Sequence, residues 1–519
     1  MNLEGLANEL LLDLFDYLDT NDLFNAFYDL NHHFNDLLFL HSQLHGYYNF
    51  QSISKTNFDL ICEDYLPPNL TRITSLHLSD HDETPGQLHL FLSYPLPFSQ
   101  FISLKSLSIT SISSEITLTT IITSLHQLPH FTHLKIQQCQ VDHEIINNGW
   151  IFDQIWRLTS LIHCCFQRRK YLWNPFFIAP QVLSNSIKVL TLQGFSYHSS
   201  ELHSLFFHTS SLENLTIDLN QVYDYENSSM EIFSSMNKLH ISSEYSLLMT
   251  KQFLQLMPNL VDLTVELAHT FISGYEWAML INQHLSLLKN FRMKMEFSYH
   301  GVNLNEEEIE RLLTTFRTNF WIVEHRWFIQ SHWYRLKKSS KIYFYTLPYS
   351  FQDLSLISNM NFQSTLPKNP IDQCDDQAEN FDRLRSLNVT LSNEEMNNNA
   401  LLLEKFIEKS TSLYSLTLSG GSVASKMLFN LCSSSIRRLH LYGCGFFDRK
   451  QCEKLIASPL GAQCEVLFIA VNDRRNILRL IELMKNLRVL HIRSQDNEDD
   501  LLDWLKDSFP HRCVHLWIC

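Results

Sequence analysis

Apolar and polar residues alternate in one short pattern that recurs along most of the chain from about residue 70. The pattern is one apolar residue, two variable residues, and then a pair of apolar residues separated by a single variable position. Alternation of this kind predicts a short strand with one buried face. The first apolar residues of the closing pairs are Leu76, Leu107, Leu134, Leu190, Leu215, Leu239, Leu263, Phe291, Leu387, Leu416, Leu439, Leu467, Leu490 and Leu516.

The spacing of these copies predicts a repeat array. Most neighbouring copies lie 23 to 31 residues apart, close to the roughly 20 to 29 residues of a leucine-rich repeat. One interval of 56 residues is twice 28, with a weaker copy near residues 158–161 in its middle. Three copies extend to the fuller consensus, and we expect Cys139 and Cys444 in two of them to be structural, at the position where the chain turns away from the strand.

Between the strands the apolar spacing becomes helical, as in Ile121, Ile122, Leu125 and Leu128. A strand and a helix in every repeat predict an α/β solenoid. We expect a curved leucine-rich-repeat array, with a parallel inner sheet and outer helices, over residues 70–296 and 381–519.

Residues 297–380 interrupt the pattern, because the copies at Phe291 and Leu387 lie 96 residues apart. An acidic helix is predicted over 305–320, followed by a stretch rich in Trp, Tyr and Phe and by a polar loop over 367–379. Degenerate repeats with buried strands would explain the aromatic residues. The alternative is an insertion that presents a binding surface or divides the solenoid.

Residues 1–45 form a separate unit, joined to the repeats by a connecting segment over 46–69. Leu6, Leu10, Leu14 and Leu18 recur every four positions, which predicts a helix with an apolar stripe, capped by Asn8. Two further short helices are expected before residue 45. Three helices this small leave apolar surface uncovered, so they either dock a partner or cap the first repeat.

The composition argues against a nucleic-acid-binding protein, a membrane protein and a metalloprotein. The formal net charge is -15, no Lys or Arg precedes Lys55, and the basic residues are scattered, so nucleic acid is not an expected partner. The longest apolar run, Val466–Val471, is too short to span a membrane, and the acidic start does not resemble a targeting signal. Eleven cysteines without a Cys-x-x-Cys pair indicate reduced thiols and no metal site. We therefore expect a cytoplasmic or nuclear protein.

Catalytic motifs are missing from the sequence: there is no phosphate loop, no dinucleotide fingerprint and no nucleophile elbow. We expect no catalytic residues, no cofactor and no enzymatic activity. The middle residue of each closing pair should face outward on the concave sheet, where it either binds a target protein or is ordinary strand surface. The candidate target-binding residues are His77, Lys135, His240, Arg292, His440, His491 and Trp517.

The order of residues in LANELLLDLFDYLDTNDLFNAF, within residues 3–42, resembles the F-box. The resemblance implies that the first helices dock the Skp-type adaptor of a cullin-RING ubiquitin ligase. Two features depart from the family pattern: Ala7 stands where the family usually has Pro, and residues 30–34 replace its closing segment. The matching apolar positions, and so the implied adaptor-binding residues, are Leu6, Leu10, Leu11, Leu14, Phe15, Leu18 and Leu23.

Together, the module and the array predict a substrate receptor of an SCF-type ubiquitin ligase. Its N-terminal helices would bind the adaptor, its solenoid would capture a target protein, and partner subunits would transfer ubiquitin. The alternative is a leucine-rich-repeat scaffold or inhibitor without any ligase, in which the helices only cap the array. An exposed stripe at Leu10, Leu11, Leu14 and Phe15 would favour docking, and burial of these residues against the repeats would favour the cap.

Overall fold

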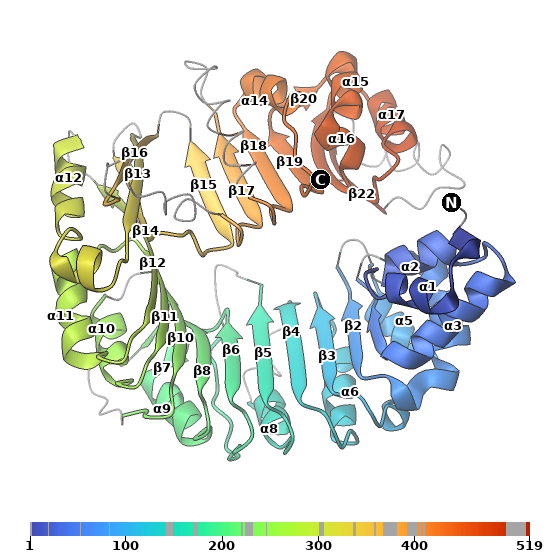
Figure 1. Cartoon of the computed structure of the whole chain (residues 1–519), viewed down its shortest axis with the longest axis horizontal. Helices are drawn as coiled ribbons and strands as arrows, with labels where there is room; N and C mark the ends of the chain where they lie inside the picture. Colours follow the sequence, from blue (N-terminus) through green and yellow to red (C-terminus); the bar gives the residue numbers. More distant parts are fainter. Residues whose placement is uncertain are drawn as a thin grey trace. The chain divides into compact units, whose positions relative to one another are not determined.

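The computed structural model of the chain (Figure 1) divides into two compact units. Unit 1 comprises Met1–Leu263 with Gln283–Leu288, and unit 2 comprises Thr264–Asn282 with Lys289–Cys519. The structure describes residues 3–18, 20–51, 53–81, 84–141, 149–169, 175–219, 222–223, 232–244, 247–299, 306–335, 339–357, 360–366, 381–391, 403, 407, 410–494 and 515–518.

Unit 1 begins with a helical module, which we define as residues 3–45. Its elements are η1 (Leu3–Gly5), α1 (Asn8–Phe15), α2 (Thr20–Phe27) and α3 (His32–His45). The three predicted helices are therefore present, but the prediction that Asn8 caps the first one is wrong. The helix starts at Asn8 itself, and Ala7 precedes it in an extended conformation without a side-chain cap.

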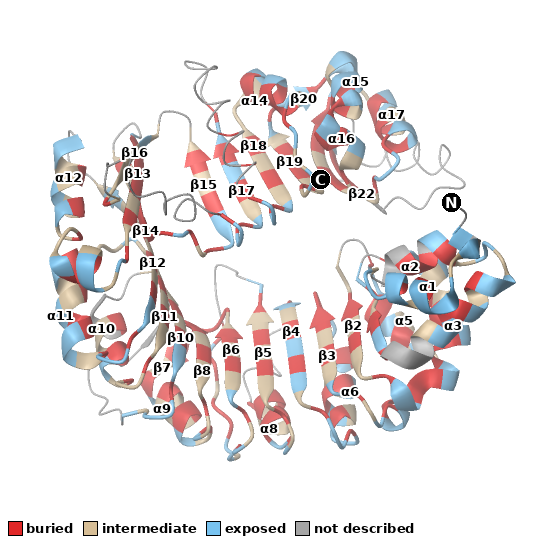
Figure 2. Cartoon of the chain, in the orientation of Figure 1, coloured by how far each residue is buried: buried red, intermediate tan, exposed pale blue. Residues whose placement is uncertain are grey.

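Strands of unit 1 form a parallel sheet in which the apolar positions of the repeats are in register. Leu76 pairs with Leu107, Leu107 with Leu134, and Leu215 with Leu239. This register places one apolar row above the next, and buried residues alternate with more exposed ones along each strand (Figure 2). In order, the strands are β1 (Tyr47–Asn49), β2 (Ser75–Ser79), β3 (Ser106–Thr110), β4 (His133–Cys139), β5 (His163–Arg168), β6 (Val189–Gln193), β8 (Asn214–Asp218) and β10 (Lys238–Ser243).

The weak repeat expected between β4 and β6 is present as β5, where Cys164 takes the apolar position between Leu134 and Leu190. Cys139 is buried as expected. Two short strands, β7 (Tyr197–His198) and β9 (Val222–Tyr223), pair with one another apart from this sheet.

Helices lie between the strands of unit 1, as the change of apolar spacing predicts. The four apolar residues singled out at 121–128 are all buried, three of them on α6. The helices of this part are α4 (Lys55–Leu60), η2 (Ile61–Tyr65), η3 (Pro67–Arg72), α5 (Gln87–Ser93), η4 (Phe98–Gln100), α6 (Glu115–Leu125), α8 (Trp150–Trp156), α9 (Ser199–Phe207) and α10 (Leu247–Gln255).

Unit 2 starts with a set of strands that departs from the parallel pattern. Strand β14 pairs antiparallel with β12 on one side and with β13 on the other, and β13 also pairs antiparallel with β16. Only residues 336–339 separate β13 from β14, and a parallel return would need a connection of about a dozen residues or more. The elements are β11 (Asp262–Ala268) and α11 (Gly274–His284), both mostly in unit 2, then β12 (Asn290–Tyr299), α12 (Glu306–Thr314), η6 (Phe320–Glu324), β13 (Ile329–Arg335), β14 (Ser340–Thr346) and β16 (Asn361–Ser364).

The predicted acidic helix therefore exists as α12, and the aromatic stretch contributes the mostly buried strands β13 and β14. The parallel sheet expected for the repeats does not continue through this stretch. The polar loop predicted over 367–379 lies outside the described residues.

The remainder of unit 2 is a second parallel array. It includes β15, a strand that none of the fourteen copies marks, and its Leu354 is in register with Leu387 of the next strand. Its strands are β15 (Asp353–Ile357), β17 (Ser386–Thr390), β18 (Ser415–Ser419), β19 (Arg438–Gly443), β21 (Val466–Val471), β22 (Val489–Ser494) and β23 (His515–Ile518), with β20 (Phe446–Phe447) paired to β21. Its helices are α14 (Gly421–Leu428), α15 (Arg449–Ala457), α16 (Pro459–Gln463) and α17 (Arg475–Leu483).

Cys444 has the structural role expected for the turn position of the repeat. Its thiol donates to the carbonyl oxygen of Leu418, in the neighbouring repeat, at 3.4 Å. Burial raises the pKa of this thiol to about 12, so it stays protonated and able to donate.

Candidate functional surfaces

The helical module combines an aromatic core with exposed leucines. Phe15 packs on Phe27 at a ring-centroid distance of 4.7 Å, and Phe27 packs on Phe34 at 5.3 Å. Among the implied adaptor-binding residues, Leu11, Phe15 and Leu23 belong to this buried core. Those three side chains shape the module, and only a rearranged module could present them to a partner.

Leu10 and Leu14 lie on the other face of α1, with 55% and 39% of their surface exposed. They are four positions apart and so occupy one side of the helix. Leu6 and Leu18 are half-buried. Among the described residues, large exposed apolar side chains gather in this small part of the chain: Leu3, Leu10, Leu14, Tyr17, Leu30, Phe39, Leu40 and Tyr47.

The module also rests on the start of the repeats. Phe24 of α2 contacts Tyr65 of η2 edge-to-face, at a centroid distance of 5.0 Å. A cavity of about 250 Å³ lies between Phe15, Leu23, Phe24 and Tyr48 of the first strand. Exposure of four residues of α1 is expected to distinguish docking from capping. The result is mixed, because Leu11 and Phe15 are buried while Leu10 and Leu14 are exposed.

The predicted concave-face residues of unit 1 occupy one register row of the sheet. His77 aligns with Ser108, and Ser108 aligns with Lys135. The imidazole Nε2 of His77 lies 3.2 Å from the hydroxyl of Thr110. Burial, and secondly the charge of Lys135, lowers the pKa of His77, so this ring is neutral at pH 7. Lys135 is exposed and His240 is half-buried.

The corresponding row in unit 2 is a stack of rings. His440, Phe468 and His491 are in register on β19, β21 and β22, with centroid distances of 4.9 Å and 3.9 Å. The guanidinium of Arg438 lies 4.7 Å from the centre of the Phe468 ring. Trp517 is in register with His491 on β23, and its side chain lies outside the described part of the structure.

Burial lowers the pKa of His440, and the charge of Arg438 lowers it further. His491 is buried. Rings on neighbouring strands are close enough to stack on one another. Other rings of the chain therefore already cover the ring faces in part of this row, and the ring edges remain for a partner to contact.

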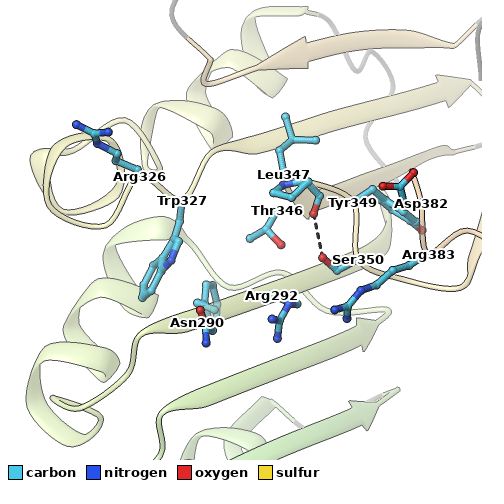
Figure 3. Close-up of a pocket in the computed structure, with 12 residues that line it drawn as sticks. Asn290, Arg292, Arg326, Trp327, Thr346, Leu347, Tyr349, Ser350, Asp382 and Arg383 are labelled. Carbon is cyan, nitrogen blue, oxygen red and sulfur yellow. Dashed lines mark hydrogen bonds between the residues drawn. The ribbon is translucent and has the colours of Figure 1, made fainter. Parts of the chain in front are cut away.

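Arg292, the remaining predicted residue, lines a cavity of about 540 Å³ within unit 2, which we call the arginine cavity. Three guanidinium groups and one carboxylate line it, so the charged side chains leave two positive charges at the cavity. Figure 3 shows its lining residues. They are Asn290, Phe291, Arg292, Arg326, Trp327, Thr346, Leu347, Pro348, Tyr349, Ser350, Asp382 and Arg383.

Four segments of unit 2 build this cavity. Arg292 stands on β12, Thr346 ends β14, Trp327 lies in the turn before β13, and Arg383 precedes β17. In Figure 3 the side chains of Arg292 and Arg383 point into the same space beside Ser350, whereas Arg326 turns its guanidinium away from them.

Polar groups around the two facing arginines are held by hydrogen bonds within unit 2. The buried hydroxyl of Thr346 accepts a hydrogen bond from the N–H of Met293 at 3.1 Å, so its own proton can be donated to a ligand. Ser350 donates to the carbonyl oxygen of Pro348 at 3.0 Å. The carboxylate of Asp382 accepts from the Thr411 hydroxyl at 3.3 Å, at the edge of the cavity.

Sequence reasoning identified Arg292 and missed the other cationic residues of the cavity. Arg326 and Arg383 lie outside the repeat pattern, 34 and 91 residues further along the chain. Their positive charges could be recognised as part of one site only after the positions of the antiparallel strands are known.

Within the described residues, no group of three or more His, Cys, Asp or Glu side chains could hold a metal ion. No helix of the described residues is long and apolar enough to cross a membrane.

Comparison with known proteins identifies no relative. No family model matches the sequence, and no curated protein matches it. Solved structures match this chain at low similarity, among them two complexes. The TLR13–ssRNA13 complex has 16% identity and a TM-score of 0.25, covering 82% of this chain, and this chain spans 46% of that one. The yeast Rad7–Elc1 complex has 12% identity and a TM-score of 0.26, covering 99% of this chain and 89% of that one.

TM-scores this low support no argument about fold or function. The α/β repeat architecture rests on the strand register and burial of this chain alone.

Proposed function

We propose that the chain is a substrate receptor of an SCF-type ubiquitin ligase. The helical module binds the Skp-type adaptor and, through it, a cullin, while the repeat array captures a target protein. The chain itself performs no catalytic step, needs no cofactor, and acts in the cytoplasm or the nucleus. Ubiquitin transfer belongs to the partner subunits.

The observation that carries the proposal is the division of α1 into two faces. Leu11 and Phe15 hold the helix to the rest of the module, which leaves Leu10 and Leu14 exposed on the other face. Exposed leucines at this spacing are an apolar anchor for a partner groove or helix. The F-box-like order of residues in this helix supplies the class of partner.

A scaffold without a ligase is the second candidate. The contact of Phe24 with Tyr65, and the burial of Phe15 and Leu23 beside the first strand, are what a cap for the array would provide. Capping and docking are compatible, because they use different side chains of the module. The two candidates therefore differ only in whether the exposed face of α1 binds an adaptor.

The test is the binding of purified Skp-type adaptor to the full chain and to a Leu10→Asp/Leu14→Asp variant. Burial of a leucine contributes roughly 1.5 to 3 kcal/mol, so the variant should bind at least about tenfold more weakly. Because both side chains are exposed in the free chain, circular dichroism and thermal unfolding should match those of the parent.

The matched control is Ile116→Asp/Phe207→Asp. These side chains are 80% and 64% exposed on α6 and α9, so the variant introduces the same charges on the outside of the repeats. Its adaptor binding should equal that of the parent. No adaptor binding by the folded parent, or equal loss in both variants, would leave the scaffold as the better account.

A further inference from the structure

The arginine cavity is a concentration of positive charge in an acidic protein. The whole chain carries a formal net charge of -15. Three arginines and a single carboxylate line the cavity, and two of the arginines, Arg292 and Arg383, point into it. An anion that reaches the cavity therefore experiences local attraction against the general repulsion of the chain, which makes binding there selective for that site.

The two arginines that point into the cavity come from segments far apart in the sequence. Arg292 lies on β12 and is half-buried, and Arg383 is exposed in the turn before β17. Guanidinium groups that converge from two sides can each donate a pair of parallel hydrogen bonds to one oxyanion. The hydroxyl of Thr346 can add a further donor.

Aromatic and apolar side chains complete the wall. Trp327 and Phe291 are buried, with ring centroids 5.3 Å apart, and the buried Tyr349 also lines the cavity. Rigid rings beside the charged groups keep the guanidinium environment dry on one side, which strengthens their hydrogen bonds. A volume of about 540 Å³ accommodates one charged side chain and part of its neighbours.

We propose that the arginine cavity binds a negatively charged side chain, a carboxylate or a phosphate monoester, in an acidic segment of a captured protein. This inference rests on the proposed function in one respect, because it specifies the class of target that the repeat array recognises. The oxyanion lies between Arg292 and Arg383, and the adjoining residues of the segment pack toward Trp327.

The experiment measures fluorescence anisotropy of short fluorescein-labelled peptides with the purified full chain. One Gly-Ser peptide carries a block of aspartates, a second carries a phosphoserine, and a third is uncharged. Both charged peptides should bind more tightly than the uncharged one, with an affinity that falls as salt rises. A tighter phosphoserine peptide identifies phosphate as the source of the charge, and a tighter aspartate peptide identifies carboxylate.

Three variants test the location of binding. Arg383→Gln alone changes an exposed residue, so the fold is retained, and it should weaken binding of the charged peptides about tenfold; adding Arg292→Gln should weaken it further. Asp382→Asn removes the carboxylate from the cavity and should strengthen binding several-fold. Arg385→Gln is the matched control, because it removes the same charge from an exposed residue that does not line the cavity.

The proposal is overturned by equal binding of charged and uncharged peptides, by the same loss in Arg385→Gln as in Arg383→Gln, or by no binding of either charged peptide at low salt. Adaptor binding is measured on the same preparations. Intact adaptor binding without peptide binding would refute this inference and leave the ligase proposal standing. Peptide binding without adaptor binding would do the reverse.

Discussion

We expect the antiparallel strands of unit 2 to lose stability in acid because they bury His332. Its side chain is fully buried on β13, and its ring stacks on Tyr343 of β14 at a centroid distance of 4.4 Å. Burial, and secondly the positive charge of Lys294, lowers the pKa of His332 from its usual 6.5 to about 3. The ring is therefore neutral in the folded chain.

Because the pKa of His332 is lower in the folded chain than in the unfolded chain, acid should lower the free energy of unfolding. Below its ordinary pKa of 6.5, the histidine is protonated in the unfolded chain, whereas in the folded chain it stays neutral until the pH approaches 3. The fold therefore has its full stability above pH 6.5 and loses stability as the pH falls toward 3. At pH 5 the unfolded chain binds this proton and the folded chain does not. One and a half pH units at about 1.4 kcal/mol per unit predict a loss of about 2 kcal/mol relative to neutral pH.

The perturbation is His332→Phe, which keeps a ring stacked on Tyr343 and cannot be protonated. Hydrogen exchange followed by mass spectrometry reports the opening free energy of peptides from β13 and β14 at pH 7.5 and pH 5, after correction for the intrinsic exchange rate. The parent should lose about 2 kcal/mol more between these pH values than the variant does. An equal loss in both proteins would refute the assignment of acid sensitivity to His332.

Two other substitutions test packing and charge. A Cβ added to Gly274, at the start of α11, would clash with the backbone carbonyl oxygen of Thr315, so Gly274→Ala should lower the melting temperature, while Gly5→Ala, in open space, should leave it unchanged. Lys294 has 13% of its side chain exposed and pairs with Asp353 at 3.0 Å, so Lys294→Met should cost about 2 kcal/mol in urea unfolding. That is below the cost for a fully buried pair, because 66% of Asp353 is exposed. The same change at Lys55, whose side chain is 73% exposed, should cost less than about 0.5 kcal/mol, and equal effects at both lysines would contradict the burial argument.

The repeat array was predictable because its strands obey a rule that the sequence displays directly. A strand with one buried face must alternate, and neighbouring repeats must place equivalent residues in register, so the apolar pairs at Leu107 and Leu134 mark both strands and their alignment. Strand β15 escaped notice because its apolar pair, Leu354 and Leu356, has no neighbouring copy at the usual spacing.

The antiparallel strands could not be derived in the same way. Both β13 and β14 are buried over most of their length, so neither alternates cleanly, and periodicity gives no direction of pairing. The arginine cavity depends on that pairing. Arg292 was found from its place in the repeat pattern, while Arg383 becomes its neighbour only through the fold of the intervening residues.

The helical module was predictable in outline, but its two faces were not. The recurrence of Leu6, Leu10, Leu14 and Leu18 indicates one apolar stripe. In the structure Leu11 and Phe15 are buried instead, because Phe27 of α2 packs on Phe15 and Phe34 of α3 packs on Phe27. Leu10 and Leu14 are left exposed.

The most direct test of the ligase proposal is hydrogen exchange of the full chain with and without a saturating amount of purified Skp-type adaptor. The adaptor should slow exchange in peptides that cover α1 and α2 and leave the strands β3 to β10 unchanged. Protection confined to the strands, or no protection anywhere in the presence of the adaptor, would contradict docking through the helical module.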